Sequence, residues 1–388
     1  MRALFSRRFL LASAVTAPAV GALGVPVAHA HGGMGRALSV RGADIGFTLQ
    51  EEAIGNQLRD PRGKVRPIEK ILEGQGATHV RLRVWTNPPA GYSTLDSALE
   101  LGRRAHRADL KILLNLHYSD FWADPGKQPT PEAWQGQDLP TLADTVRRYT
   151  AHAVAAFAAQ GSPVDMVQIG NEVTSGMLHP IGELYPTDGR PQQWEAFTTL
   201  LKAGATGARQ GAHRVRQPKI MLHIDRGGDN GGSVWFFDHM LEFEVPFDLI
   251  GESYYPIWHG SLADLQANLG DLAPRYDKDI VVVETAYPWT ADNGDDLPNF
   301  YPSAEPLPDE DTYPATPQGQ AAFFDALREI LLGVPGGHRL GFFDWEPGWL
   351  PGVGWEPGAG TPNDNLTMWD FSGQALPSLR AFRPAGVA

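Results

Sequence analysis

Short apolar runs recur eight times along this chain, each separated from the next by a longer segment with helical features. Runs of this length and composition are typical of strands that are buried on both faces of a parallel sheet. The expected strands cover residues 42–47, 78–85, 111–116, 167–172, 220–224, 247–251, 280–285 and 340–345. Eight alternating units predict an α/β fold, a (β/α)8 TIM barrel built as a single domain.

Helical patterns fill most of the connections. Helices are expected from residue 67, over 93–108, 141–160, 194–208, 234–241 and 262–269, and after the cap at Thr316. A doubly wound open sheet is the alternative architecture, but no glycine-rich fingerprint follows the first strand. No internal repeat or low-complexity linker interrupts the sequence, so residues 38–388 are expected to form one catalytic domain.

Residues 1–30 are expected to lie outside that domain. Arg7 and Arg8 precede an apolar stretch that ends in Ala28-His29-Ala30, an arrangement typical of a secretory signal peptide. The adjacent arginines favour the bacterial twin-arginine route, so we expect a secreted or periplasmic protein. A membrane anchor is the alternative, although Pro18 and Pro26 interrupt the short apolar stretch.

Net charge restricts the partners. Because Arg2, Arg7 and Arg8 would leave with the signal peptide, the formal charge falls from -13 to -16. An acidic protein without a basic patch repels phosphate backbones and acidic polymers. We therefore expect a neutral polymer as the substrate and no nucleic-acid partner. We also expect a monomer, with no membrane contact after signal removal.

Two glutamates stand at the ends of apolar runs. Glu172 follows the fourth run and Glu284 the seventh. In a parallel barrel these strand ends face one another across a single crevice. Glycoside hydrolases use two carboxyl groups in this way, about 5–5.5 Å apart in retaining and about 6.5–9.5 Å apart in inverting enzymes. The sequence leaves the separation open, and either glutamate alone could simply cap a helix.

Other strand ends carry further candidates for the crevice: Asp44, Arg83, His117, Asn171, His223, Tyr254 and Trp345. Alternation places Arg81, Arg83 and Trp85 on one strand face, and charged side chains inside a barrel require carboxylate partners. Arg83 could equally form a structural salt bridge. The two histidines could equally be hydrogen-bonded core residues.

Metal and serine chemistry are weaker alternatives. The sequence contains no H-E-x-x-H, no cysteine and no G-x-S-x-G. No cofactor is expected to be required. An oxygen-rich run after the seventh strand contains Asp292, Asp295, Asp296 and Asn299, which are residue types that bind Ca²⁺. A structural Ca²⁺ is therefore possible but not predicted.

Several runs resemble the arabinogalactan endo-β-1,4-galactanases, glycoside hydrolase family 53 of the retaining (β/α)8 glycosidase clan. The matching runs are residues 42–45, 81–85, 117–128, 167–172, 253–256, 258–260, 282–287, 345–347 and 364–365. The most specific is HYSDFWADPGKQ at 117–128. Together they span nearly the whole of the chain that follows the expected signal.

The resemblance implies that Glu172 is the acid/base, that Glu284 is the nucleophile, and that the anomeric configuration is retained. The implied substrate is the neutral β-1,4-galactan of pectin (type I arabinogalactan), cut internally. It further implies that Arg83, His117, Asn171, Tyr255 and Trp345 line the reacting subsite. With the other candidates, the expected substrate-binding set is Asp44, Arg83, His117, Asn171, His223, Tyr254, Tyr255, Trp258, Trp345 and Asp364.

Some positions depart from the family pattern: Asn115, His179, Glu252, Asp344, residues 86–88, and Leu297 where a calcium-ligating histidine is found in some members. These departures leave the glutamate pair intact but put the sugar-binding subsites in question. Another retaining β-glycanase, of mannanase or xylanase type, is therefore the alternative enzyme. A non-catalytic carbohydrate-binding barrel is the alternative outside enzymes.

Overall fold

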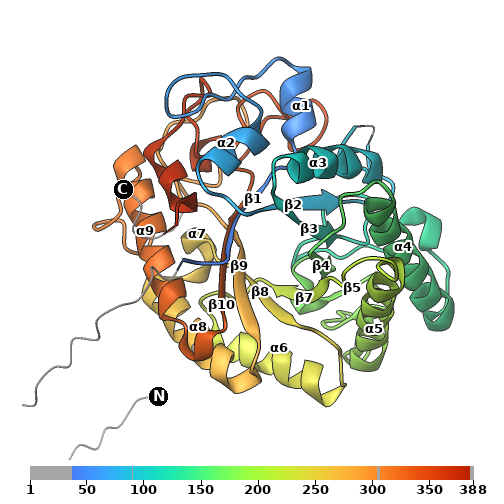
Figure 1. Cartoon of the computed structure of the whole chain (residues 1–388). Helices are drawn as coiled ribbons and strands as arrows, with labels where there is room; N and C mark the ends of the chain where they lie inside the picture. Colours follow the sequence, from blue (N-terminus) through green and yellow to red (C-terminus); the bar gives the residue numbers. More distant parts are fainter. Residues whose placement is uncertain (1–36, 90, 304–305, 385–388) are drawn as a thin grey trace, which may run out of the picture. The chain divides into compact units, whose positions relative to one another are not determined.

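Eight parallel strands close into a barrel in the computed structural model, which describes residues 37–89, 91–303 and 306–384 (Figure 1). Around the barrel they follow the order β1 (Val40–Asp44), β2 (His79–Val84), β3 (Lys111–Leu116), β4 (Met166–Ile169), β7 (Lys219–Ile224), β8 (Leu249–Ser253), β9 (Asp279–Thr285) and β10 (Arg339–Asp344). The (β/α)8 prediction is confirmed and the open sheet is excluded. The expected signal at residues 1–30 lies outside the described residues.

Six long helices surround these strands (Figure 1). They are α3 (Leu95–Arg107), α4 (Leu139–Ala159), α5 (Trp194–Gly211), α6 (Asn230–Glu242), α8 (Leu262–Tyr276) and α9 (Pro317–Gly333). Shorter helices are α1 (Thr48–Ala53), α2 (Ile68–Gly74) and α7 (Pro256–His259), and β5 (Gly176–Met177) pairs antiparallel with β6 (Gly182–Glu183) after β4. No helix within the described part of the chain is long and apolar enough to cross a membrane.

Side-chain caps set several helix starts. Asp138 and Asp229 accept hydrogen bonds from the backbone N–H groups of Thr141 and Gly232, so α4 and α6 begin earlier than their apolar patterns indicate. Strand limits shift in a similar way. The fourth strand ends at Ile169 rather than residue 172, because Gly170 has a φ of +80° that leaves the extended conformation.

Alternating side chains fill the interior of the barrel. Val40, Leu113, Met166, Met221, Leu249, Val281, Val283 and Phe343 form one buried apolar cluster there. The residues between them point outward and join the larger core under the helices. Because the inside is packed with side chains, the barrel is solid and any site must lie at its mouth.

One extra residue interrupts the alternation of β9 near its carboxyl end. Glu252 of β8 pairs with Val282, whereas the next residue, Ser253, pairs with Glu284, so Val283 has no counterpart. The same shift occurs against β10 on the other side. Val283 and Glu284 consequently both point inward, Val283 into the interior cluster and Glu284 into the cavity above it. This β-bulge aims the glutamate at the mouth of the barrel.

Candidate active site

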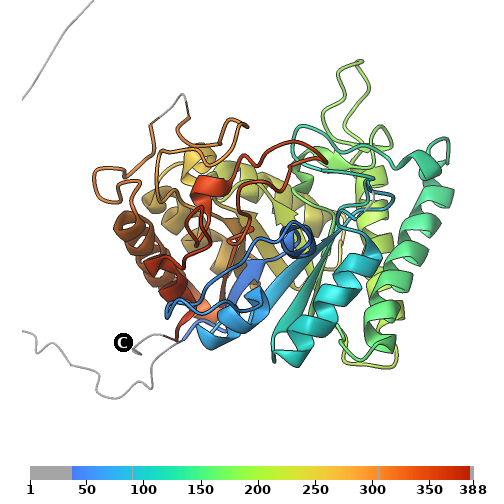
Figure 2. The same ribbon diagram turned by 90° about the horizontal axis from the view of Figure 1, so that it is seen from above.

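A cavity of about 380 Å³ opens where the strands end. The long connections after β4 (green) and β9 (orange) rise on the same side of the barrel (Figure 2). Eight of the residues singled out in the sequence line this cavity: Arg83, His117, Asn171, Glu172, Tyr255, Trp258, Glu284 and Trp345. The topology therefore brings together side chains that lie at the carboxyl ends of β2 and β9 or in the connections that follow β3, β4, β8 and β10.

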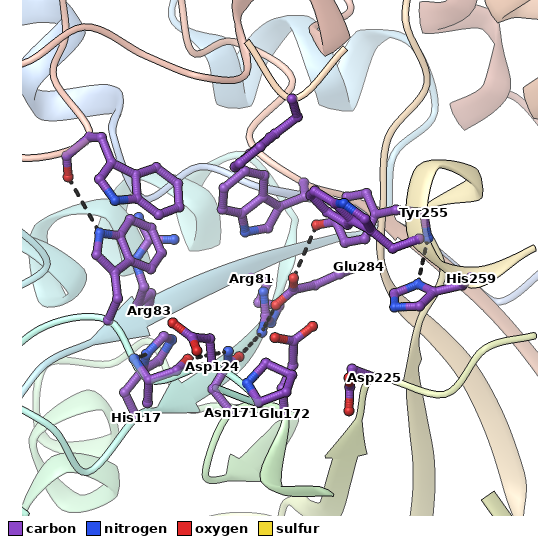
Figure 3. Close-up of a pocket in the computed structure, with 17 residues that line it drawn as sticks. Arg81, Arg83, His117, Asp124, Asn171, Glu172, Asp225, Tyr255, His259 and Glu284 are labelled. Carbon is purple, nitrogen blue, oxygen red and sulfur yellow. Dashed lines mark hydrogen bonds and ion pairs between the residues drawn. The ribbon is translucent and has the colours of Figure 1, made fainter. Parts of the chain in front are cut away.

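The two glutamates lie in this cavity in different surroundings (Figure 3). Glu284 is 6% exposed, forms an ion pair of 2.7 Å with Arg81, and accepts a 3.0 Å hydrogen bond from the Tyr255 hydroxyl. Burial raises the pKa of Glu284, and the charge of Arg81 opposes that rise. The Arg81 pair and the Tyr255 hydrogen bond both favour the ionised form of Glu284.

Glu172 forms no ion pair with any cation among the described residues. Burial raises its pKa well above the ordinary value, and the negative charges of Glu284 and Asp225 raise it further, while a hydrogen bond from Ser253 opposes the rise. Its backbone has a φ of +45°, uncommon for a residue with a side chain, at the turn that follows β4. Burial raises the pKa of both carboxyl groups, but a cation and a hydroxyl favour the ionised form of Glu284, whereas neighbouring negative charges favour the protonated form of Glu172.

Arg81 was not in the predicted site, although it shares a strand face with Arg83. Its buried guanidinium donates to Asp44 at 2.6 Å and to Asn171 at 2.9 Å, in addition to the ion pair with Glu284. Its Nε donates to Gln168 at 3.1 Å. The alternation that places it inside the barrel was the available sequence signal.

Arg83 contacts a different carboxylate. It forms an ion pair with Glu346 at 3.0 Å, and its guanidinium lies 4.5 Å from the ring centre of Trp122. Trp122 in turn stacks on Trp355 with ring centres 4.3 Å apart. Arg83 therefore supports an aromatic wall of the cavity through a cation–π contact.

Several cavity residues escaped the sequence prediction: Arg81, Trp122, Ala123, Asp124, Pro125, Asp225, His259, Phe300 and Trp355. Trp122 and Asp124 belong to the HYSDFWADPGKQ run, which could have indicated them. Phe300 and Trp355 lie in long connections without periodic patterning. Only the folded chain brings Trp355 against Trp122, 233 residues away.

Four predicted binding residues do not line the cavity. Asp44 is fully buried behind Arg81, and His223 lies behind Glu172, accepting a hydrogen bond from its backbone N–H at 3.3 Å. The Tyr254 hydroxyl donates to the Gly260 carbonyl at 3.0 Å, and its ring stacks on Phe323 of α9, so it faces the helices. Asp364 accepts hydrogen bonds from Gly294 and Asn299, which join the last loops to the connection after β9.

Comparison with known sequences identifies the family. A sequence model described as Glycosyl hydrolase family 53 matches residues 40–382. The chain belongs to glycosyl hydrolase family 53. One family 53 relative, from Aspergillus terreus, is named "Probable arabinogalactan endo-beta-1,4-galactanase A"; it is 38% identical over 325 residues, covering 82% of this chain and 88% of its own.

Solved family 53 structures have the same fold. The Ignisphaera aggregans GH53 catalytic domain superposes with a TM-score of 0.81 at 34% identity, over 89% of this chain and 95% of that one. A fungal β-1,4-galactanase gives a TM-score of 0.78 at 32% identity, over 89% and 99% of the two chains. A Paenibacillus barcinonensis GH10 structure, at 14% identity and a TM-score of 0.56, shares the barrel alone.

The departures from the family 53 pattern lie outside the cavity wall. Asn115 donates to the side chain of Asn171 at 3.1 Å, and Glu252 faces α6, where Ser233 donates to it at 3.1 Å. Asp344 is fully buried on the outer face of β10, where burial raises its pKa well above the ordinary value. His179 contacts the Ser175 carbonyl at 3.1 Å. None of these four residues lines the cavity.

The acidic connection after β9 is tied into the loops around it. Asp295 accepts hydrogen bonds from the backbone N–H groups of Leu297 and Thr361, both at 2.8 Å. Asn299 donates to Asp364 at 2.6 Å. Within residues 37–89, 91–303 and 306–384, no group of three or more His, Cys, Asp or Glu side chains is placed to hold a metal ion.

Proposed function

We propose that this chain is a retaining endo-β-1,4-galactanase that cleaves the neutral galactan side chains of pectin (type I arabinogalactan). The observation that carries the proposal is the pair of glutamates in one cavity, of which Glu284 is paired with Arg81 and Glu172 faces other carboxyl groups. Family membership and relatives named as arabinogalactan endo-beta-1,4-galactanases support it.

Glu284 is the proposed nucleophile. Arg81 contacts one carboxylate oxygen of Glu284 and the Tyr255 hydroxyl donates to the other. Each oxygen keeps a further lone pair, with which it can attack the sugar. In the first step a Glu284 oxygen bonds to the anomeric carbon and the glycosidic C–O bond breaks. The product of this step is a covalent glycosyl ester on Glu284.

Glu172 is the proposed acid/base. It gives its proton to the departing glycosidic oxygen, which leaves as the new sugar hydroxyl. In the second step the Glu172 carboxylate takes a proton from water, the water oxygen bonds to the anomeric carbon, and the ester bond to Glu284 breaks. The two displacements together retain the configuration at that carbon.

The remaining cavity residues are proposed to hold the sugar chain. The Asn171 amide nitrogen donates one hydrogen to the Ala123 carbonyl at 3.0 Å, and we propose that its second hydrogen binds the sugar 2-hydroxyl. Trp345, Trp258 and Tyr255 offer flat apolar faces to sugar rings. An uncharged, ring-stacking polymer is compatible with the acidic chain.

We also propose a cellular context. Residues 1–30 act as a twin-arginine signal, residues 38–388 form the catalytic domain, and the mature protein is a secreted or periplasmic monomer. Mass spectrometry of the exported protein would place its first residue near 31, and an intact Met1 would contradict the signal. Hydrolysis is proposed to need no cofactor, so dialysis against EDTA should leave the rate unchanged.

The deciding assay is release of reducing ends from linear β-1,4-galactan, beside mannan, xylan and cellulose. Activity on galactan alone, with a ladder of short oligomers, is the expected result. Preferential cleavage of mannan or xylan would replace the substrate assignment, and absence of turnover on all four would support a binding protein.

A further inference from the structure

Ser253, the last residue of β8, lies between Glu172 and His223. Its hydroxyl donates to Glu172 Oε1 at 2.7 Å, and His223 Nε2 lies 2.8 Å from the same hydroxyl oxygen. Ser253 and His223 are both fully buried. The acid/base therefore rests on a short chain of side chains that lies behind the cavity.

One backbone N–H group decides which atoms donate and which accept in this series of hydrogen bonds. The N–H of Glu172 points at His223 Nδ1 at 3.3 Å, and the Gln168 amide nitrogen lies 2.9 Å from the same atom. Because a backbone N–H can only donate, Nδ1 must carry a lone pair. A neutral His223 therefore holds its proton on Nε2.

His223 also stays neutral. Burial, followed by the charge of Arg81, lowers its pKa well below the ordinary value. Its Nε2–H donates to the Ser253 oxygen, so the hydroxyl hydrogen of Ser253 must point the other way, to Glu172. In this series of hydrogen bonds, His223 therefore donates to Ser253, and Ser253 donates to Glu172.

We propose that Ser253 and His223 are positioning residues that give the two carboxyl oxygens of Glu172 different roles. Oε1 accepts the Ser253 hydroxyl throughout the reaction, and Oε2 alone gives the proton to the glycosidic oxygen and later takes one from water. The inference rests on the proposed acid/base function of Glu172. A carboxyl group without this contact could carry its proton on either oxygen, and one of the two would be unproductive.

The same contact adjusts the proton affinity of Glu172. Burial raises the pKa of Glu172, and the Ser253 hydrogen bond opposes that rise. The other titratable groups that face it are Glu284 of β9, Asp225 after β7, Asp124 after β3 and Tyr255 after β8. Three of these four are carboxyl groups, so the Ser253 hydroxyl acts against a surplus of negative charge.

Ser253→Ala tests the proposal by its pH profile. Loss of the hydroxyl removes a hydrogen bond that favours the charged form, so the pKa of Glu172 rises further. The basic limb of kcat/KM on galactan should then move to higher pH, and the optimal rate should fall about tenfold, a part of what general acid–base catalysis contributes. Ser253→Thr, which keeps the hydroxyl, should return the basic limb toward its wild-type position.

Ser233→Ala is the matched control. Ser233 is also fully buried and donates to a buried glutamate, Glu252, at 3.1 Å, but on the outer face of β8. This variant should leave the basic limb in place. An unmoved limb in Ser253→Ala, or an equal shift in Ser233→Ala, would overturn the proposal.

The tautomer can be read in the wild-type protein, without any variant of Ser253. Histidine ¹⁵N shifts, with His223 assigned through the missing signal of His223→Gln, should report Nε2–H and no titration between about pH 5 and 8. An Nδ1–H ring or a charged ring would contradict the chain of donors. Failure of the wild type to cleave galactan would defeat the proposed function alone, because the tautomer is measured in the unliganded protein.

Discussion

The guanidinium of Arg81 lies 2.7 Å from the carboxylate of Glu284, and both groups are buried at the mouth of the barrel. Asp44 binds the other side of the same cation at 2.6 Å. One cation is therefore shared between a structural carboxylate and the proposed nucleophile. Such an arrangement fixes the nucleophile in place before any substrate arrives.

Arg81→Lys should lower kcat/KM on galactan by about 100-fold, because one ammonium group cannot reach the acceptors that a planar guanidinium bridges. Initial rates across substrate concentrations would measure the effect. Arg103→Lys is the control, since Arg103 pairs with Glu100 on the exposed face of α3. A change below about threefold in Arg81→Lys would show that the shared cation is dispensable.

Glu284→Gln should reduce kcat by at least about 1,000-fold, because an amide cannot form the covalent ester. Glu252→Gln is a matched control, since Glu252 is also buried but faces Ser233, away from the cavity. Its pKa is raised well above the ordinary value, mainly by burial, so a neutral amide resembles its native state. Rates within about tenfold of wild type for Glu284→Gln would remove it as the nucleophile.

Glu172→Ala should be nearly inactive on galactan yet should release an activated aryl leaving group from an aryl β-1,4-galactobioside in a rapid burst. A good leaving group departs without a proton, so only the second step still needs the base. Stopped-flow absorbance would separate the burst from the slow steady state, and azide should speed the latter. A variant without any burst would contradict the acid role.

Glu51 makes the folding stability depend on pH. Burial raises its pKa to about 8, and its oxygens accept hydrogen bonds from the Leu350 N–H at 3.0 Å and from Asn56 at 2.6 Å. Above its ordinary pKa the folded state retains a proton that the unfolded chain has lost. Its contribution to the free energy of unfolding is therefore full in acid and is lost as the pH rises through about 8.

Glu51→Gln should consequently lose less stability than wild type between about pH 5 and 8.5, as measured by urea unfolding with tryptophan fluorescence. Glu73→Gln, an exposed change on α2, is the control and should follow the wild-type slope. Parallel slopes for Glu51→Gln and wild type would mean that Glu51 does not titrate in this range.

The barrel was predictable because each apolar run records a strand buried on both faces. The glutamate pair was predictable for a related reason: strand ends lie at the mouth of a parallel barrel, although the inward direction of Glu284 also depends on the bulge in β9. Tyr254 shows the limit of that rule, since it lies at a strand end yet its ring faces α9 while Tyr255 lines the cavity. Alternation along the chain, rather than strand order, separates these two neighbours.

Contacts between distant loops were not predictable. Trp122 and Trp355 stack although neither lies in a periodic segment, and no local pattern records which loops meet. The sequence left two roles for Arg83, one in the active site and one in a structural salt bridge. Its ion pair with Glu346 and its place beneath Trp122 combine structural support with the shape of the cavity.

The extra residue in β9 is a phase shift within a repeating pattern. Before it, the strand follows the two-residue period that packs the barrel; after it, the period restarts with the opposite face inward. Without the bulge, Val283 would pair with Ser253 and Glu284 would fall on the outer face of the strand, although every cavity residue would still be present in the sequence. One strand thus carries both the packing of the barrel, through Val281 and Val283, and the inward direction of the proposed nucleophile, through the register shift next to Val283.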